Sequence, residues 1–101
     1  MNKGSLELDL DRVTASWKGT LVPLTLTEFW VVHALAKHPG HVRTREQLME
    51  AANVVLDPAS VTSQIKRIRA KFSVVDKEFS AIEVVRILGY RWVTDQDPLP
   101  D

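Results

Sequence analysis

The chain has 101 residues, a formal net charge of zero, 45% hydrophobic residues and no cysteine. This length suits one domain with a substantial core, and the lack of cysteine excludes disulfides and cysteine-ligated metal sites. No apolar run reaches the roughly 18 residues of a membrane span, and the first residues lack the apolar segment of a signal peptide, so we expect a cytoplasmic protein.

The N-terminal quarter predicts a small antiparallel sheet. Residues 6–10 alternate strictly between leucine and an acidic residue, which is typical of a half-buried strand. Residues 13–17 and 21–24 predict two more strands, and Pro23 indicates that the third strand is short or at an edge. The first five residues are expected to be a flexible N-terminus or a remnant of cloning, and the domain itself is predicted to span 6–94.

Two capping boxes predict the starts of two helices. Thr25 with Glu28, and Thr44 with Gln47, have the spacing at which each side chain satisfies a free backbone donor of the other residue. Residues 38–40 (His-Pro-Gly) end the first helix, because proline cannot continue it and glycine tolerates the left-handed cap. The second helix is expected to be short.

A third helix is predicted from Asp57-Pro58 to about Phe72, since aspartate is a good N-cap and proline is tolerated at the first helical position. Its apolar residues form one stripe that must face the core: Val61, Ile65, Ile68 and Phe72. The opposite face holds small residues flanked by cations: Ala59, Ser63, Ala70, Lys66 and Arg67. Segment 58–73 also contains Arg69 and Lys71 and has no acidic residue.

This basic face has two interpretations. Small residues let a helix lie deep in the DNA major groove, about 12 Å wide, and long cations beside them reach base edges and phosphates. Thr62 and Gln64 add hydrogen-bonding groups near the helix N-terminus, where the dipole favours phosphate. The alternative is an ordinary solvated face, which the neutral net charge favours. The context favours DNA, because a short capped helix precedes this one and a predicted hairpin, with strands at 82–86 and 90–93, carries Arg86 after it.

Trp30 also has two interpretations. It falls on the side of the first helix away from the apolar residues Phe29, Val32 and Leu35. Either it packs against the N-terminal sheet, or it is an exposed anchor for a partner protein, since tryptophan is enriched at interface hot spots.

No pattern in the sequence indicates an enzyme, a metal or a cofactor. The histidines at positions 33, 38 and 41 match no metal-ligand spacing, and there is no nucleophile elbow or phosphate-binding glycine loop. The acidic, proline-containing residues 95–101 are expected to be disordered.

Five stretches occur in a specific order and spacing: 24–29 (LTLTEF), 38–40 (HPG), 44–48 (TREQL), 61–72 (VTSQIKRIRAKF) and 89–92 (GYRW). Through them the chain resembles, over roughly residues 6–93, the effector domain of OmpR/PhoB-type response regulators, which are bacterial proteins. The resemblance implies an α+β winged helix-turn-helix fold with an N-terminal antiparallel sheet, three helices and a C-terminal hairpin wing.

The resemblance implies sequence-specific binding of double-stranded DNA, with the third helix in the major groove and the wing at the minor groove. The matching DNA-contact positions are Thr62, Ser63, Lys66 and Arg67 at bases or nearby phosphates, Gln64 and Arg69 at the backbone, and Arg86 in the wing. It also implies head-to-tail dimers on direct-repeat operators, contact with RNA polymerase, and control through phosphorylation of a receiver domain in a two-component phosphorelay. That receiver domain is missing from these 101 residues.

The chain departs from the family pattern at two places. Ile87 stands where the family usually has a glycine after the wing arginine. Residues 53–57 form a short apolar connection, where the family usually has a longer loop with a Trp-Gly pair that meets RNA polymerase. The apolar wing turn, the neutral charge and Trp30 favour the alternative function, a winged-helix module for protein–protein interaction.

Overall fold

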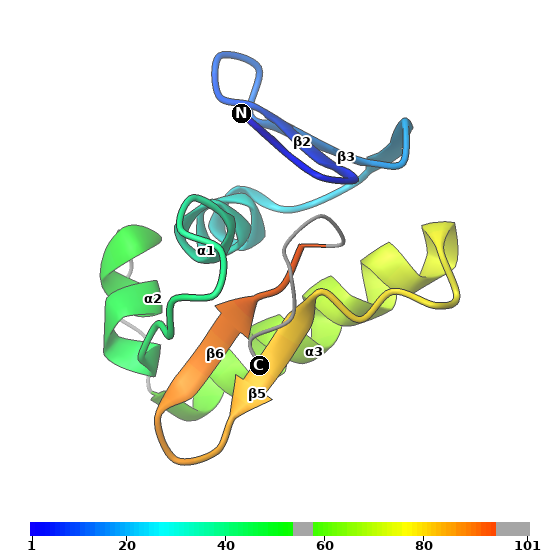
Figure 1. The fold of residues 1–101 in the computed structure, drawn as a ribbon. Helices are drawn as coiled ribbons and strands as arrows, with labels where there is room; N and C mark the ends of the chain where they lie inside the picture. Colours follow the sequence, from blue (N-terminus) through cyan, green and yellow to red (C-terminus); the bar gives the residue numbers. More distant parts are fainter. Residues whose placement is uncertain (54–57, 95–101) are drawn as a thin grey trace.

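The computed structural model describes residues 1–53 and 58–94, which form a four-stranded sheet, three helices and a two-stranded hairpin (Figure 1). In chain order these are β1 (Asn2–Lys3), β2 (Leu6–Asp9), β3 (Thr14–Trp17), β4 (Thr20–Val22), α1 (Leu26–Ala36), α2 (Arg45–Ala51), α3 (Pro58–Val75), β5 (Ile82–Val85) and β6 (Gly89–Trp92). The predicted order of sheet, helices and hairpin is confirmed. The predicted cap Asp57, most of the connection at 53–57 and the predicted disordered tail lie outside the described residues.

The N-terminal sheet is antiparallel throughout, with its strands in chain order. β2 ends at Asp9 because the Oδ1 atom of this residue accepts the backbone N–H groups of Asp11 and Arg12, at 3.1 and 3.0 Å, and so forms the following turn. β4 ends at Val22, before the predicted boundary, because Pro23 has no N–H to donate.

The first residues of the chain form a strand, in contrast to the flexible segment expected from the sequence. Asn2 and Lys3 of β1 pair with β2, and Gly4, at φ +62°, allows the reversal between the two strands. The N-terminal ammonium group of Met1 donates to the carbonyl of Leu8 at 2.7 Å. A strand of two polar residues has no hydrophobic alternation from which it could be predicted.

Both predicted capping boxes form. At the start of α1, Thr25 Oγ1 accepts the N–H of Glu28 at 3.2 Å, and Glu28 Oε1 accepts the N–H of Thr25 at 2.8 Å. α3 continues to Val75 instead of ending at Phe72, because Val75 lies one turn further along the apolar stripe and packs against the core.

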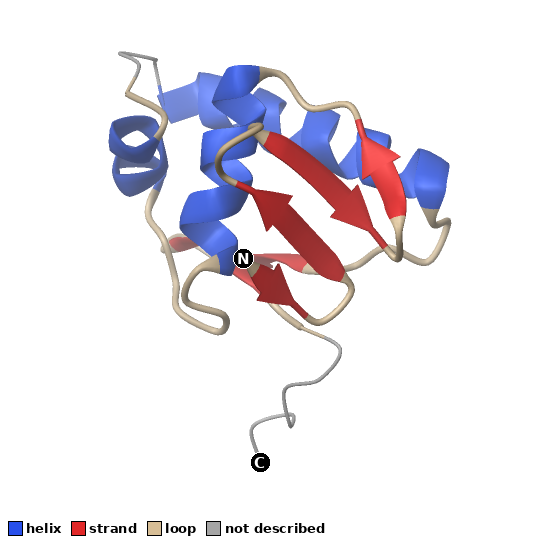
Figure 2. Cartoon of the chain, turned by 90° about the horizontal axis from the view of Figure 1, so that it is seen from above, coloured by secondary structure: helices blue, strands red, loops and turns tan. Residues whose placement is uncertain are grey.

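One core joins the sheet, the helices and the hairpin. The predicted stripe of α3 is 0–2% exposed: Val61, Ile65, Ile68 and Phe72. Trp17 of β3 and Trp92 of β6 both meet the ring of Phe72 edge-on, with centroids 5.8 and 6.1 Å apart. Seen from above, the N-terminal sheet lies over the helices (Figure 2). No helix among the described residues is long and apolar enough to cross a membrane.

Candidate nucleic-acid interface

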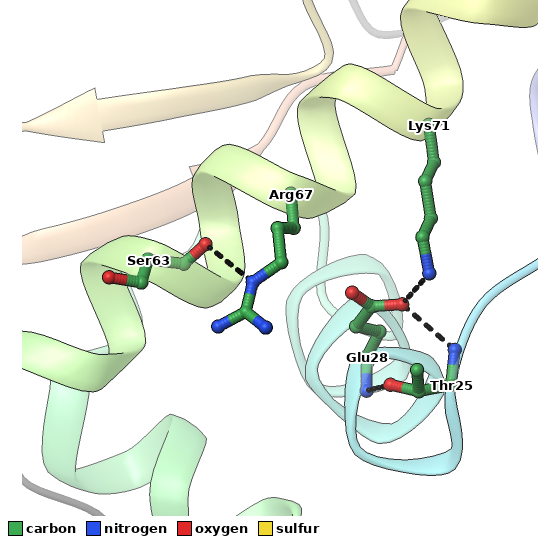
Figure 3. Close-up of polar contacts among 5 residues, drawn as sticks. All are labelled: Thr25, Glu28, Ser63, Arg67 and Lys71. Carbon is green, nitrogen blue, oxygen red and sulfur yellow. Dashed lines mark hydrogen bonds and ion pairs between the residues drawn. The ribbon is translucent and has the colours of Figure 1, made fainter.

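The exposed residues of α3 opposite the core are Thr62, Ser63, Lys66, Arg67, Ala70 and, near the end of the helix, Val74. Arg67 Nε donates to the carbonyl of Ser63 one turn earlier, at 3.5 Å (Figure 3). Within the described residues neither Lys66 nor Arg67 pairs with an acidic side chain. The structure therefore brings two unpaired cations beside small residues, as predicted. The side chain of Ala59 lies outside the described part.

The other two cations of α3 make contacts within the protein. Lys71 Nζ pairs with the carboxylate of Glu28 at the start of α1 (Figure 3). Arg69 is half-buried, and its guanidinium donates to the carbonyl of Ile82 at the start of β5, at 2.8 Å. The run of four cations seen in the sequence is thus divided into two that are exposed and two that hold α3 against its neighbours.

The Glu28 carboxylate is buried and receives two hydrogen bonds (Figure 3). Burial alone would raise its pKa, but the Lys71 ammonium and the Thr25 backbone N–H outweigh burial and lower the pKa below its ordinary value. Glu28 is therefore charged at neutral pH and fixes α3 relative to α1. The exposed cations lie on the same helix.

The hairpin is held against α3 and the segment before α2. The hydroxyl groups of Tyr90 in β6 and Thr62 in α3 lie 3.4 Å apart. Arg43 and Tyr90 exchange two backbone hydrogen bonds, at 2.7 and 3.0 Å. Gly89 allows this approach, because a Cβ at this position would lie 2.1 Å from the carbonyl oxygen of Arg43. Sequence reasoning assigned no role to Arg43 or Gly89, since their contact is formed only in the folded chain.

Arg86 is exposed in the turn between β5 and β6. The nearby carboxylate of Glu83 accepts from Arg91 Nε at 3.0 Å, so Glu83 already has a cationic partner. No ion pair forms at Arg86 within the described residues. The wing arginine therefore presents its charge to solvent on the hairpin that is fastened to α3.

Gln64 is half-buried in α3, and its Oε1 atom is buried without a hydrogen-bond partner in the described structure. Unlike Thr62 and Ser63, the two exposed residues that precede it, Gln64 is not on the outer face. The predicted site residues thus fall into an exposed set and two half-buried members, Gln64 and Arg69.

Trp30 is half-buried and meets the rings of Phe29 and His33 edge-on, at 5.0 and 5.4 Å. It lines a hollow of about 430 Å³ between α1 and the end of α2, together with Leu26, Thr27 and residues 51–53. Trp30 thus borders this hollow and also packs against the core, so neither of the two interpretations of Trp30 is decided.

The rings of His38 and His41 lie 5.7 Å apart in the turn that follows α1. Among the described residues, no group of three or more histidine, aspartate or glutamate side chains is placed to hold a metal ion.

Comparison with known proteins identifies the family. The sequence profile of the family described as "Transcriptional regulatory protein, C terminal" matches residues 19–92, which include the helices and the hairpin. The chain belongs to this family. It is a family of regulatory domains rather than of enzymes, in agreement with the expectation that the chain has no catalytic site.

Full-length and structural relatives agree with this membership. The transcriptional regulatory protein BaeR of Escherichia coli is 39% identical over 94 residues, which cover 89% of this chain and 39% of BaeR. The chain therefore spans about two fifths of such a relative. The structure of the AdeR DNA-binding domain in complex with an intercistronic region superposes with a TM-score of 0.83 at 27% identity. The superposition covers 93% of this chain and 99% of the AdeR domain in that structure. The DNA-binding domain of CpxR from E. coli gives a TM-score of 0.79 at 29% identity, covering 93% and 95%.

Proposed function

We propose that this chain is the DNA-binding effector domain of a bacterial response regulator and that it binds double-stranded DNA sequence-specifically. The observation that carries this proposal is the division of the α3 cations, because Lys66 and Arg67 are exposed beside the small residues Ser63 and Ala70 and form no ion pair with any residue that the structure describes. A helix face of this kind fits the major groove, where an arginine can bond to a guanine edge in two places. The domain structure of AdeR, which this fold resembles, was determined with DNA bound.

Each predicted site residue has a role in this proposal. Thr62, Ser63, Lys66 and Arg67 contact bases or nearby phosphates from the exposed face of α3. Arg86 reaches the minor groove from the wing, where the potential of a narrow A·T-rich groove attracts a guanidinium group. Gln64 and Arg69 lie at the border of the interface. Because Arg69 already bonds to Ile82, its main contribution is to set the angle of the hairpin.

The larger protein is part of the same proposal. Since the chain spans about two fifths of BaeR, the remainder would supply a receiver domain whose phosphorylation controls DNA binding in the cytoplasm. Two copies would bind a direct-repeat operator head to tail, and bound copies would contact RNA polymerase.

The proposal can be tested with duplexes recovered from a random pool by the wild-type chain. Arg67→Ala should weaken binding to such a duplex by about 1–3 kcal/mol if the guanidinium pairs with a guanine. The core should stay intact, because Arg67 lies outside the buried stripe. Lys77→Ala is the matched control, since Lys77 is an exposed cation beyond the end of α3. Fluorescence anisotropy gives the affinities and circular dichroism checks the fold. Equal affinities for the two variants would contradict the assignment of α3.

A second candidate function is protein–protein interaction at the hollow beside Trp30. It is favoured by the aliphatic side chain of Leu26, which is exposed at the rim of that hollow. Trp30→Ala should leave the affinity for the recovered duplex unchanged under either function. If Trp30→Ala lost DNA affinity while its fold stayed intact, the hollow beside Trp30 would belong to the DNA interface and would not be a separate protein-binding surface.

A further inference from the structure

The tip of the hairpin is apolar and exposed. Ile87 is 97% exposed and Leu88 is 60% exposed, beside the exposed Arg86. Figure 1 shows the turn between β5 and β6 projecting beyond the neighbouring helices. The two side chains therefore form a convex apolar point instead of the polar turn that usually closes a hairpin.

Ile87 also has an unfavourable backbone conformation. The N–H of Leu88 donates to the carbonyl of Val85 at 3.0 Å, which places Ile87 third in a four-residue turn, at φ +73°. A positive φ at this position favours glycine or asparagine, and it is a true outlier for a β-branched residue. At 97% exposure the side chain has almost no packing that could offset this strain. An outlier without an internal benefit points to a role in binding.

The surroundings of the tip indicate a DNA groove as its binding partner. Arg86, which forms no ion pair in the part of the chain that the structure describes, places a positive charge directly beside the two aliphatic side chains. Tyr90 and Thr62 connect the hairpin to the exposed basic face of α3. A stable protein–protein contact needs about 800 Å² on each partner, which two side chains on a narrow turn cannot supply. Isoleucine and leucine beside a cation are the combination with which other proteins enter the minor groove and wedge between base pairs.

We propose that Ile87 and Leu88 enter the minor groove as an apolar wedge next to Arg86, which partly unstacks one base step and bends the duplex. This inference rests on the proposed DNA-binding function and adds a determinant of specificity to it. Pyrimidine–purine steps such as TA and CA/TG unstack most easily. The wing should therefore select such a step at a fixed distance from the bases that α3 contacts.

The test uses Ile87→Asn and Ile87→Gly, since both residues tolerate the left-handed turn. The midpoint of thermal unfolding should rise by several degrees in both variants, because the strain at position 87 is removed. Affinity for the duplex recovered by the wild-type chain should fall about tenfold, because apolar surface is no longer buried. Stability and affinity thus change in opposite directions, which loss of folding cannot cause. The control is Leu21→Asn, on β4, because Leu21 is as exposed as Leu88, at 60%.

Two probes in the duplex report the wedge itself. Energy transfer between dyes at the two ends should show a bend with the wild-type chain that is reduced with Ile87→Asn. The fluorescence of 2-aminopurine, placed at each flanking step in turn, should increase at one step only, and only with the wild type. A straight, fully stacked duplex in the wild-type complex would overturn the proposal. So would unchanged affinity in both Ile87 variants, or wild-type self-association that Ile87→Asn abolishes. Failure of the wild-type chain to recover any duplex would instead refute the DNA-binding function itself.

Discussion

Replacing Glu28 by glutamine should destabilise the domain through one identifiable contact. The Glu28 side chain is 3% exposed and the Lys71 side chain is 30% exposed. Glutamine retains an oxygen that can accept the Thr25 N–H, so the substitution removes mainly the charge that pairs with Lys71. Breaking a fully buried ion pair costs about 3–5 kcal/mol. Because Lys71 can reach water, the expected cost is about 1.5–3 kcal/mol, which corresponds to a melting temperature lower by about 6–24 °C.

The stability that Glu28→Gln loses should depend on pH, and it should be largest at neutral pH. The pKa of Glu28 is lower in the folded chain than its ordinary value of 4.5, because Lys71 and Thr25 outweigh the effect of burial. Its stabilisation is therefore fully present above pH 4.5 and is lost as the pH falls through the lower, folded pKa. Urea unfolding of wild type and Glu28→Gln should differ most at neutral pH and converge in acid.

The control for this comparison is Glu7→Gln, because Glu7 is exposed on β2. Its effect on the free energy of unfolding should stay within about 0.5 kcal/mol. If Glu28→Gln cost no more than Glu7→Gln at neutral pH, or if its cost were the same at every pH, the assigned role of the Glu28–Lys71 pair would be wrong.

Two further substitutions test the contacts that support the wing and the end of α3. Hydrogen bonds from the Trp17 indole and Lys18 lower the pKa of Asp76 from 3.8 to about 2. The stabilisation by the charged Asp76 carboxylate is thus lost as the pH falls from 3.8 toward 2. Over that pH range the urea midpoint of Asp76→Asn should therefore fall less steeply than that of the wild type. An equally steep fall in both proteins would contradict this role of Asp76. Gly89→Ala should lower the free energy of unfolding by more than about 2 kcal/mol, because the new Cβ would meet the Arg43 carbonyl. A loss below about 1 kcal/mol would show that the hairpin can shift away.

The elements that could be predicted from the sequence are those whose signals are local. The Thr25 and Thr44 capping boxes need only residues three positions apart, and both form. The α3 stripe repeats with the helical period and is buried as expected. Where a boundary was misplaced, as at Val75, a contact with the core extended the element by one turn.

The features that could not be predicted depend on contacts between distant parts of the chain. The division of the α3 cations follows from Glu28, 43 positions before Lys71, and from the Ile82 carbonyl, 13 positions after Arg69. The helical period places Lys66 on the outer face and Arg69 and Lys71 closer to the apolar stripe, but it carries no information on the distant groups that these two residues meet. The left-handed conformation of Ile87 could not be predicted from the sequence either, because a β-branched residue is rarely found at positive φ.

The central claim, that the exposed face of α3 binds DNA, is tested most directly by nuclear magnetic resonance. The isotope-labelled chain would be titrated with a duplex recovered from the random pool, and amide shifts would be followed residue by residue. We predict the largest changes at the exposed α3 positions from Thr62 to Arg67 and at Arg86, with little change around Trp30. Changes concentrated around Trp30, with α3 unaffected, would contradict the claim and support a protein-binding module instead.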